Sequence, residues 1–298
     1  MENKKNDYLA IDIGGTAIKS ALINQSGRIL TQSEVATPKK SLVAFLQTLD
    51  EIIVPNLAKI QGIGFSIPGT IDSQSGTIYH GGSLPYLDTF KLVTSLEDQY
   101  QKQIVIENDG KAAALAELFD GGLKGINNGM AITLGTGLGG GLVINGNLYK
   151  GVNFQAGEIS FVLENQAKGD YYGLKYSAVG MINEIASQLN LANKNDGRAV
   201  FNLINEKNDI AWPIFKNYCR GIATLIYNIQ VVLDLEVVAI GGGISSQKIV
   251  VEQIKHELNE VLATKEIVNK IIKLPRIVLT KHRNSANLIG AVYPFLTH

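Results

Sequence analysis

Several features that mark particular classes of protein are scarce or missing in this sequence of 298 residues. Cys219 is the single cysteine, which excludes an intramolecular disulfide bond and any metal cluster held by several thiolates. The 27 basic and 27 acidic residues cancel, and no basic tract stands out. The charge therefore gives no electrostatic reason to expect a nucleic acid or an anionic membrane as a partner.

Long hydrophobic runs are also absent. The N-terminal stretch MENKKNDY is polar and contains no apolar core of a signal peptide. The longest apolar stretches, such as residues 129–144, are too short and too rich in glycine to span a membrane. We therefore expect a soluble, cytoplasmic protein. Because 45% of the residues are hydrophobic, the chain can bury a sizeable core, and its length predicts about two domains.

Strand and helix patterns alternate along the chain, which is typical of sheets covered by helices. A tight turn joins the first two predicted strands, and a glycine pair ends the third predicted helix. Buried strands are predicted over residues 8–14, 20–24, 60–69 and 104–109, and helices over 41–60, 92–103 and 110–122, with a helical region from about 177 to 232.

The opening pattern of the chain returns later in the sequence. Residues 131–149 match residues 10–30 with a constant offset of 121. Gly14 matches Gly135 at the start of the glycine-rich turn. Beyond the turn, Asn24 matches Asn145. Glycine-rich strands can coincide by chance, but identities on both sides of the turn favour a duplication.

The duplication predicts two similar α/β halves around a central cleft. We expect a smaller N-terminal domain over residues 1–107 and a larger domain over residues 108–285. A C-terminal helix, at about residues 286–298, is expected to complete the first domain.

Three glycine-rich turns follow predicted strands, at residues 14–16, 135–137 and 241–243. Backbone N–H groups in such turns can approach an anion without interference from Cβ atoms. Two of these turns facing each other from duplicated halves would hold a polyphosphate chain. The simpler interpretation is that each glycine only makes a hairpin. No GxxxxGK[ST] motif is present, and the GxGxxG at 135–140 precedes a strand pattern instead of a helix.

Asp12 is an acidic residue inside an apolar strand, directly before the first glycine turn. A carboxylate beside a phosphate-binding turn is suited to hold Mg²⁺, either directly or through water. Thr16 would add a hydroxyl donor, and Lys19 would add positive charge. These residues favour a nucleotide site over a purely structural turn.

The chain contains, in order, the motifs DIGGTAIK, SIPGTID, ENDGKAAALAE, LGTGLGGG, AGE and IGGGIS. This series resembles the signature of the ROK family of sugar kinases, within the actin-like ATPase superfamily. The resemblance extends from Asp12 to beyond Gly243. It implies a two-domain, ribonuclease H-like ATPase fold, with ATP in the cleft, Mg²⁺, and phosphorylation of a hexose hydroxyl. The family is often dimeric, and the sequence itself does not decide the oligomeric state.

The resemblance assigns the nucleotide to all three turns. It places Asp12, Gly14, Gly15 and Thr16 in the first phosphate loop, Gly135, Thr136 and Gly137 in the second, and Gly242 and Gly243 near the adenosine.

The same resemblance assigns residues to the sugar. Asp109 matches the catalytic aspartate, which accepts the proton of the sugar 6-hydroxyl as the phosphoryl group moves. The alternative is that Asp109 only caps the helix that follows it. The sugar ligands implied by the resemblance are Asn108, Glu158 and the loop of Ser66, Pro68 and Gly69, whose backbone covers the sugar.

One stretch departs from the common family pattern. Many members continue from this glutamate as Glu-x-Gly-His and then carry a zinc knuckle with several cysteines, whereas here Phe161 replaces the histidine and no cysteine follows. A tetrahedral zinc site cannot be assembled without these ligands, so we expect no structural zinc. Lys175 falls near the position of a second sugar-binding glutamate. The loss of hydrogen-bonding groups at the C1–C2 end of the sugar suggests that O1 is substituted.

Three further stretches, at residues 81–90, 156–163 and 290–295, look most similar to the zinc-less β-glucoside kinases of the family. Those enzymes phosphorylate O6 of the non-reducing glucose in cellobiose and related β-glucosides. Phe161, Tyr86 and Phe90 would then stack on the aglycone or second sugar. The alternative is that these aromatic side chains pack in the core or on the surface.

The sequence leaves three alternative functions. A kinase for a free hexose, either glucose or N-acetylmannosamine, would use the same core sugar ligands. A sugar-sensing transcriptional regulator would need a DNA-binding domain ahead of the first phosphate loop, and that loop begins at Asp12. A catalytically silent sugar-binding protein is disfavoured because both Asp12 and Asp109 are present.

Overall fold

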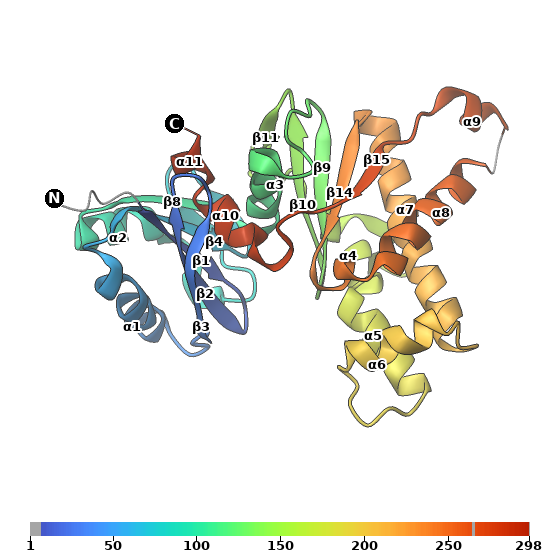
Figure 1. The fold of residues 1–298 in the computed structure, drawn as a ribbon, viewed down its shortest axis with the longest axis horizontal. Coiled ribbons are helices and arrows are strands. Elements are labelled where there is room, and N and C mark those ends of the chain that lie inside the picture. Colours follow the sequence, from blue (N-terminus) through green and yellow to red (C-terminus); the bar gives the residue numbers. More distant parts are fainter. Residues whose placement is uncertain (1–6, 264–265, 298) are drawn as a thin grey trace. The chain divides into compact units, whose positions relative to one another are not determined.

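The computed structural model describes residues 7–263 and 266–297, which form two compact units (Figure 1). Unit 1 contains the chain up to residue 121, residues 150–156, and the chain from residue 285 onward. Unit 2 contains residues 122–149 and 157–284. The boundary differs from the expected one at 107/108, because the helix that follows residue 108 packs with unit 1. The C-terminal residues from 285 to 297 also belong to unit 1, and residue 298 lies outside the described residues.

Unit 1 is built on a five-stranded mixed sheet with the strand order β3-β2-β1-β4-β8. The three N-terminal strands form an antiparallel meander, and β4 and β8 extend the sheet in parallel to β1. Their bounds are β1 (Asp7–Ile13), β2 (Ala17–Asn24), β3 (Ile29–Ala36), β4 (Ile60–Ile67) and β8 (Gln103–Asn108).

The sheet of unit 1 is covered on both faces, as the alternation in β1 requires. Leu9 and Ile11 join the hydrophobic cluster that contains Phe45 of α1, whereas Tyr8 and Ala10 join the cluster with α3 and α10. The helices of unit 1 are α1 (Leu42–Ile53), α2 (Leu92–Tyr100), α3 (Asp109–Asp120), α10 (Ala286–Ala291) and α11 (Tyr293–Leu296), and a small sheet is formed by β5 (Thr70–Asp72), β6 (Thr77–His80) and β7 (Phe90–Lys91).

The helix predicted over residues 41–60 is shorter in the structure. It ends at Ile53, and a turn of 3₁₀ helix over Val54–Asn56 follows. Pro55 explains the early end, because proline has no amide hydrogen and its ring clashes with the carbonyl four residues earlier.

Unit 2 repeats the sheet of unit 1. Its strand order is β11-β10-β9-β14-β15, with an antiparallel meander of three strands followed by two strands parallel to β9. The duplication predicted from the sequence therefore appears as two sheets of the same topology. The strands are β9 (Gly129–Leu134), β10 (Leu138–Ile144), β11 (Asn147–Tyr149), β14 (Val237–Gly241) and β15 (Arg276–Leu279).

The two repeats differ by one residue at the glycine turn. Ile13 pairs with Ile18 across the first turn, whereas Leu134 pairs with Leu138 across the second. The second turn is therefore one residue shorter. The constant offset of 121 predicted from the sequence ends at this turn, and the matches drawn beyond it are one ladder position out of register.

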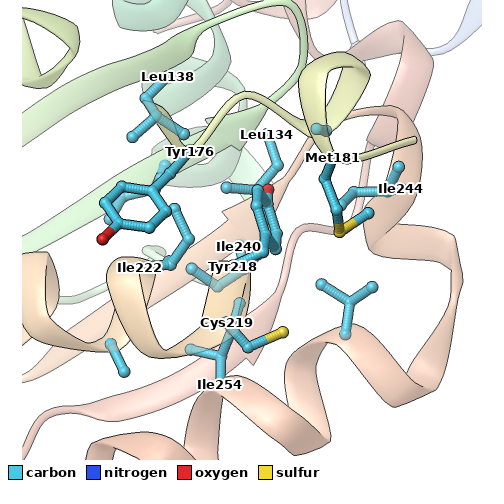
Figure 2. Close-up of a cluster of buried hydrophobic side chains, with 14 of the residues drawn as sticks. Leu134, Leu138, Tyr176, Met181, Tyr218, Cys219, Ile222, Ile240, Ile244 and Ile254 are labelled. Carbon is cyan, nitrogen blue, oxygen red and sulfur yellow. The ribbon is translucent and has the colours of Figure 1, made fainter. Parts of the chain in front are cut away.

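A hydrophobic core lies between the sheet of unit 2 and its helices, and Figure 2 shows part of it. The helical region predicted over 177–232 consists of three helices. No helix in the described part of the chain is both long and apolar enough to cross a lipid bilayer. The helices are α4 (Tyr172–Lys175), α5 (Ala178–Gln188), α6 (Gly197–Asn205), α7 (Ala211–Leu233), α8 (Lys248–Leu262) and α9 (Glu266–Ile271), with a hairpin of β12 (Leu163–Asn165) and β13 (Asp170–Tyr171).

Candidate active site

The first glycine turn connects β1 to β2 and is fixed by side chains outside it. Thr37 Oγ1 donates a hydrogen bond to the carbonyl of Gly14 at 2.6 Å, and the Thr37 amide donates to the carbonyl of Thr16 at 3.0 Å. A Cβ atom at Gly15 would lie 2.9 Å from Ser83 Oγ, so a larger residue there would displace the Ser83 side chain. Thr16 itself is exposed. The turn is therefore a fixed backbone with an accessible hydroxyl.

Asp12 is held by two donors from other elements. Its Oδ1 atom accepts hydrogen bonds from Ser66 Oγ at 2.9 Å and from Asn287 Nδ2 at 3.1 Å. Burial raises the pKa of Asp12, and the two hydrogen bonds and the charge of Lys19, its cross-strand partner, act in the opposite direction. Asn287 lies in α10, so the sequence carries no local signal that links it to Asp12.

Asn108 and Asp109 lie at the junction of β8 and α3. Asn108 Oδ1 accepts a hydrogen bond from the Lys111 amide at 3.1 Å, so Asn108 caps the helix and Asp109 is its first residue. The alternative that Asp109 is the N-cap is therefore wrong. The Asp109 Oδ1 atom accepts from the Gly110 amide at 2.7 Å and from Asn108 Nδ2 at 3.1 Å. These bonds orient the Asp109 carboxylate.

The loop after β4 reaches the same place in unit 1. Asn108 Nδ2 also donates to the carbonyl of Gly69 at 2.9 Å. Gly69 has a φ angle of 103°, and a Cβ atom there would collide with the carbonyl oxygen of His80. Pro68 and Gly69 are half-buried, whereas Ser66 is fully buried. Within unit 1, the structure therefore brings together Asp12, Ser66, Gly69 and the Asn108–Asp109 pair.

Glu107 and Lys150 support this junction and were not found from the sequence. Glu107 Oε1 accepts a hydrogen bond from the Asn108 amide at 2.9 Å, and Glu107 Oε2 lies 2.7 Å from Lys150 Nζ. Lys150 Nζ also donates to Ser73 Oγ. The buried Glu107 carboxylate is thus balanced by a lysine from a distant part of the chain.

The second glycine turn connects β9 to β10 in unit 2. The Gly135 amide donates to the carbonyl of Gly137 at 3.0 Å, and the Gly135 carbonyl accepts from the Ala178 amide at 2.9 Å. Ser160 Oγ accepts from the Leu138 amide at 3.0 Å and donates to the Leu138 carbonyl at 2.9 Å. Thr136, at the middle of the turn, is exposed.

The second and third glycine turns are both flanked by side chains that pack in the hydrophobic core of unit 2. Leu134 and Leu138 flank the second turn, and Ile240 and Ile244 flank the third (Figure 2). All four side chains belong to one buried cluster. The two turns are therefore positioned by the same packed layer.

The third glycine turn borders a cavity. Gly242 has a φ angle of 92°, and a Cβ atom there would collide with the backbone of Leu134. Gly243 begins the short helical turn Gly243–Ser246 and has open space beside it. The adjoining cavity has a volume of about 550 Å³ and lies within unit 2. Its lining includes Asn193, Asn195, Asp196, Arg198, Phe201 and Gln247.

Glu158 precedes the helical turn Ile159–Phe161 in unit 2. The Phe161 amide donates to the Glu158 carbonyl at 3.1 Å, which closes the turn. Gly157, with a φ angle of 88°, packs against the backbone of Gly140 in β10. The Phe161 ring is 70% exposed and contacts the Tyr171 ring edge-on, with centroids 6.5 Å apart. The structure thus places Phe161 in one turn with Glu158.

Tyr86 and Phe90 do not share this environment. The Tyr86 ring packs on Phe45 in the core of unit 1, and its hydroxyl donates to the Pro38 carbonyl at 2.6 Å. Phe90 is partly buried against the same core. The expectation that these two rings stack on an aglycone is therefore replaced by the core-packing alternative.

Lys175 has a structural partner. Its Nζ atom lies 2.6 Å from Glu164 Oε2, and Tyr176 donates to the other oxygen of Glu164 at 3.2 Å. Among residues 7–263 and 266–297, no group of three or more His, Cys, Asp or Glu side chains is arranged to hold a metal ion.

The sequence matches the ROK family over residues 8–297. The chain belongs to the ROK family. A β-glucoside kinase from Listeria innocua is 30% identical over 301 residues, covering 96% of each chain. A glucokinase from Halalkalibacterium halodurans is 31% identical over 267 residues, covering 80% of each.

Solved structures of ROK proteins share the fold of the chain. A ROK family protein from Streptococcus pneumoniae in complex with sucrose has a TM-score of 0.85 and 26% identity, and the match covers 97% of this chain and 98% of that one. A ROK family glucokinase from Streptomyces griseus, in complex with glucose and AMPPNP, has a TM-score of 0.81 and 21% identity, with 96% and 97% covered. The chain has the two-domain, actin-like ATPase fold of these proteins.

Proposed function

We propose that this ROK protein is an ATP-dependent sugar kinase that phosphorylates the 6-hydroxyl of the glucosyl unit of β-glucosides such as cellobiose. The observation that carries the substrate class is Phe161, an exposed aromatic ring in the same turn as Glu158. A ring at this place offers no hydrogen bond to a free O1 hydroxyl, whereas it can contact a substituent on C1.

The chemistry assigned to the chain is phosphoryl transfer to an alcohol. Such a transfer depends on positioning, on electrostatic stabilisation of the phosphates, and on a residue that accepts the proton of the attacking hydroxyl. Asp109 is proposed for that last role, because the Gly110 amide and Asn108 hold its carboxylate in one orientation. Asn108 and Glu158 are proposed to bind ring hydroxyls, and the backbone of Pro68 and Gly69 is proposed to cover the sugar.

The glycine turns suit the phosphates of ATP. The turn with Gly14, Gly15 and Thr16 and the turn with Gly135, Thr136 and Gly137 each carry an exposed threonine in a fixed backbone. The cavity lined by Gly243, in the third glycine turn, is large enough for a nucleoside. The complex of the Streptomyces griseus glucokinase with AMPPNP supports a nucleotide as the phosphoryl donor in the family.

Asp12 fits a Mg²⁺ site. Its carboxylate is held by Ser66 and Asn287 beside the first glycine turn, and oxygen is the ligand that Mg²⁺ prefers. Mg²⁺ held by Asp12, directly or through water, would neutralise charge on the phosphates. Lys19 pairs with Asp12 across the strands and adds positive charge on the same side.

The comparisons support the substrate class in two ways. The Listeria innocua relative is named a β-glucoside kinase. Sucrose, bound in the Streptococcus pneumoniae protein, is a sugar whose anomeric carbons are both substituted. The second candidate is a kinase for a free hexose, glucose or N-acetylmannosamine, and the relative named glucokinase favours it.

The test is coupled ADP release with Mg-ATP over a panel of sugars. The panel contains glucose, N-acetylmannosamine, methyl β-D-glucoside, cellobiose and gentiobiose. The proposal expects ADP release with the β-glucosides at a higher kcat/KM than with either free hexose. Release with a free hexose alone would keep the kinase and reject the substrate class, and no release with any sugar would reject the kinase.

A further inference from the structure

An apolar face adjoins the turn of Glu158, and of its residues only Phe161 has a role in the function proposed above. It consists of Phe161, Leu163, Tyr171 and Leu174, whose side chains are 70%, 50%, 38% and 80% exposed. Single exposed apolar residues are common on proteins, whereas a contiguous group indicates a binding surface. We call these four residues the apolar platform.

The platform is ordered by strand pairing, a ring contact and a backbone hydrogen bond. Leu163 and Tyr171 are paired across the β12–β13 hairpin, and the Tyr171 ring supports the Phe161 ring edge-on. The Tyr172 amide donates to the Val162 carbonyl at 2.9 Å, which ties the hairpin to the turn of Phe161. Leu174 follows in α4, the helix that packs against that turn.

Two charged groups beside the platform are engaged with each other. Lys175 and Glu164, from α4 and β12, form an ion pair at 2.6 Å, and Tyr176 donates to the same carboxylate. These groups are therefore committed to the hairpin itself. A second sugar has hydroxyls that need hydrogen-bond partners when water is removed, whereas an aryl or alkyl group does not.

We propose that the apolar platform is the subsite for the C1 substituent of the substrate, and that it selects an aromatic or alkyl aglycone over a second sugar. The inference rests on the proposed function, because it takes the glucosyl unit to bind at Glu158. The backbone hydrogen bond between Phe161 and Glu158 places one end of the platform next to that position. Tyr171 contacts the Phe161 ring, and Leu174 lies in α4, which packs against both β13 and the turn of Phe161.

The proposal is tested by comparing phenyl β-D-glucoside, methyl β-D-glucoside and cellobiose as substrates of the full chain. The expected kcat/KM for the phenyl glucoside exceeds that for the methyl glucoside by about fivefold to tenfold, the effect of one aromatic contact. It also exceeds the value for cellobiose. In Leu174→Ser and Tyr171→Ala, the ratio of phenyl to methyl glucoside falls toward one.

The matched control is Val232→Ser, which removes an equally exposed apolar side chain, 77% exposed in α7, at a place outside the platform. This variant should keep the wild-type ratio. The proposal is overturned if the wild-type ratio of kcat/KM for phenyl over methyl glucoside is near one, or if both platform variants keep the wild-type ratio. Turnover of methyl glucoside in these cases leaves the proposed kinase intact. Absence of turnover with all sugars would instead reject the kinase.

The alternative occupant of the platform is a second copy of the chain. The molar mass of the wild type and of Leu174→Ser in solution, measured by light scattering, separates the two cases. If Leu174→Ser converts a dimer to a monomer and leaves the ratio of phenyl to methyl glucoside unchanged, the platform is a subunit interface and the subsite is rejected.

Discussion

Ser160 makes two hydrogen bonds to one residue: its Oγ atom accepts from the Leu138 amide at 3.0 Å and donates to the Leu138 carbonyl at 2.9 Å. Leu138 directly follows the second glycine turn, and Ser160 lies two residues after Glu158. The Ser160 side chain therefore links the turn after Glu158, proposed for the sugar, to the second glycine turn, proposed for the phosphates. This link gives a physical route for sugar binding to affect nucleotide binding.

Replacement of Ser160 by alanine should weaken that communication. Each lost hydrogen bond is worth about 0.5–1.5 kcal/mol, so we expect the sugar-induced gain in AMPPNP affinity to fall by about threefold to tenfold. Calorimetric titration of AMPPNP with and without methyl β-D-glucoside measures this gain. Gly173→Ala should act in the same direction, because its Cβ atom would collide with Ser160 Oγ. The exposed Ser187 supplies the control variant Ser187→Ala, and an unchanged gain in Ser160→Ala would refute the link.

Asp109→Asn tests the proposed base. The amide keeps the size of the side chain but cannot accept the proton of the 6-hydroxyl. We expect kcat to fall by about 10²–10⁴-fold, while the dissociation constant of the sugar stays close to that of the wild type. Stopped-assay kinetics and calorimetry measure the two quantities. The control Asp98→Asn changes an exposed carboxylate in α2, and near-normal turnover in Asp109→Asn would remove Asp109 from this role.

Lys150→Met tests the support of Asn108. It leaves the buried Glu107 carboxylate without its cation, at a cost to the free energy of unfolding of about 1–3 kcal/mol. Because Glu107 also accepts from the Asn108 amide, we expect KM for the sugar to rise more than kcat falls. The double variant Glu107→Gln/Lys150→Met should recover part of the lost stability. Chemical denaturation and steady-state kinetics check both effects, and a single variant as stable as the wild type would contradict the account.

The ion pair of Glu164 and Lys175 gives a prediction on pH. The hydrogen bond from Lys175 lowers the pKa of Glu164 below its usual 4.5, and the bond to Glu164 raises the pKa of Lys175. The stability from Glu164 is thus complete above pH 4.5 and is lost as the pH falls through the lower pKa of the folded state. Lys175→Met should therefore lower Tm by about 1–3 °C at pH 7, as an exposed pair allows, and by less at pH 3. Equal differences at both pH values would exclude the pair as the cause.

The family resemblance is visible in the sequence, and the duplicated sheets could be predicted from it, because glycine turns and strand patterns are local features. The residues that hold the site were not predictable in this way. Asn287 reaches Asp12 only through the fold, and Lys150 reaches Glu107 from the segment after β11. The capping role belongs to Asn108 and not to Asp109, because the helix begins at Asp109, one residue earlier than the sequence pattern predicts. Such contacts depend on tertiary packing, which spacing along the chain does not encode.

Aromatic residues show the same limit. Tyr86 and Phe161 are both aromatic residues in stretches that resemble β-glucoside kinases, and the resemblance predicts the same role for both. The structure separates them, because Tyr86 packs on Phe45 whereas Phe161 is exposed beside Glu158. Residue type suggests what a side chain can contact, and only burial shows whether a ligand can reach it.

The most direct test of the central claim is a competition between two sugars for limiting Mg-ATP. Equal concentrations of glucose and methyl β-D-glucoside are mixed with the protein, and ³¹P and ¹³C NMR identify the products and their ratio. This ratio equals the ratio of the kcat/KM values. The account predicts that the 6-phosphate of methyl β-D-glucoside predominates. A product mixture dominated by glucose 6-phosphate, or phosphorylation at any other hydroxyl, would contradict it.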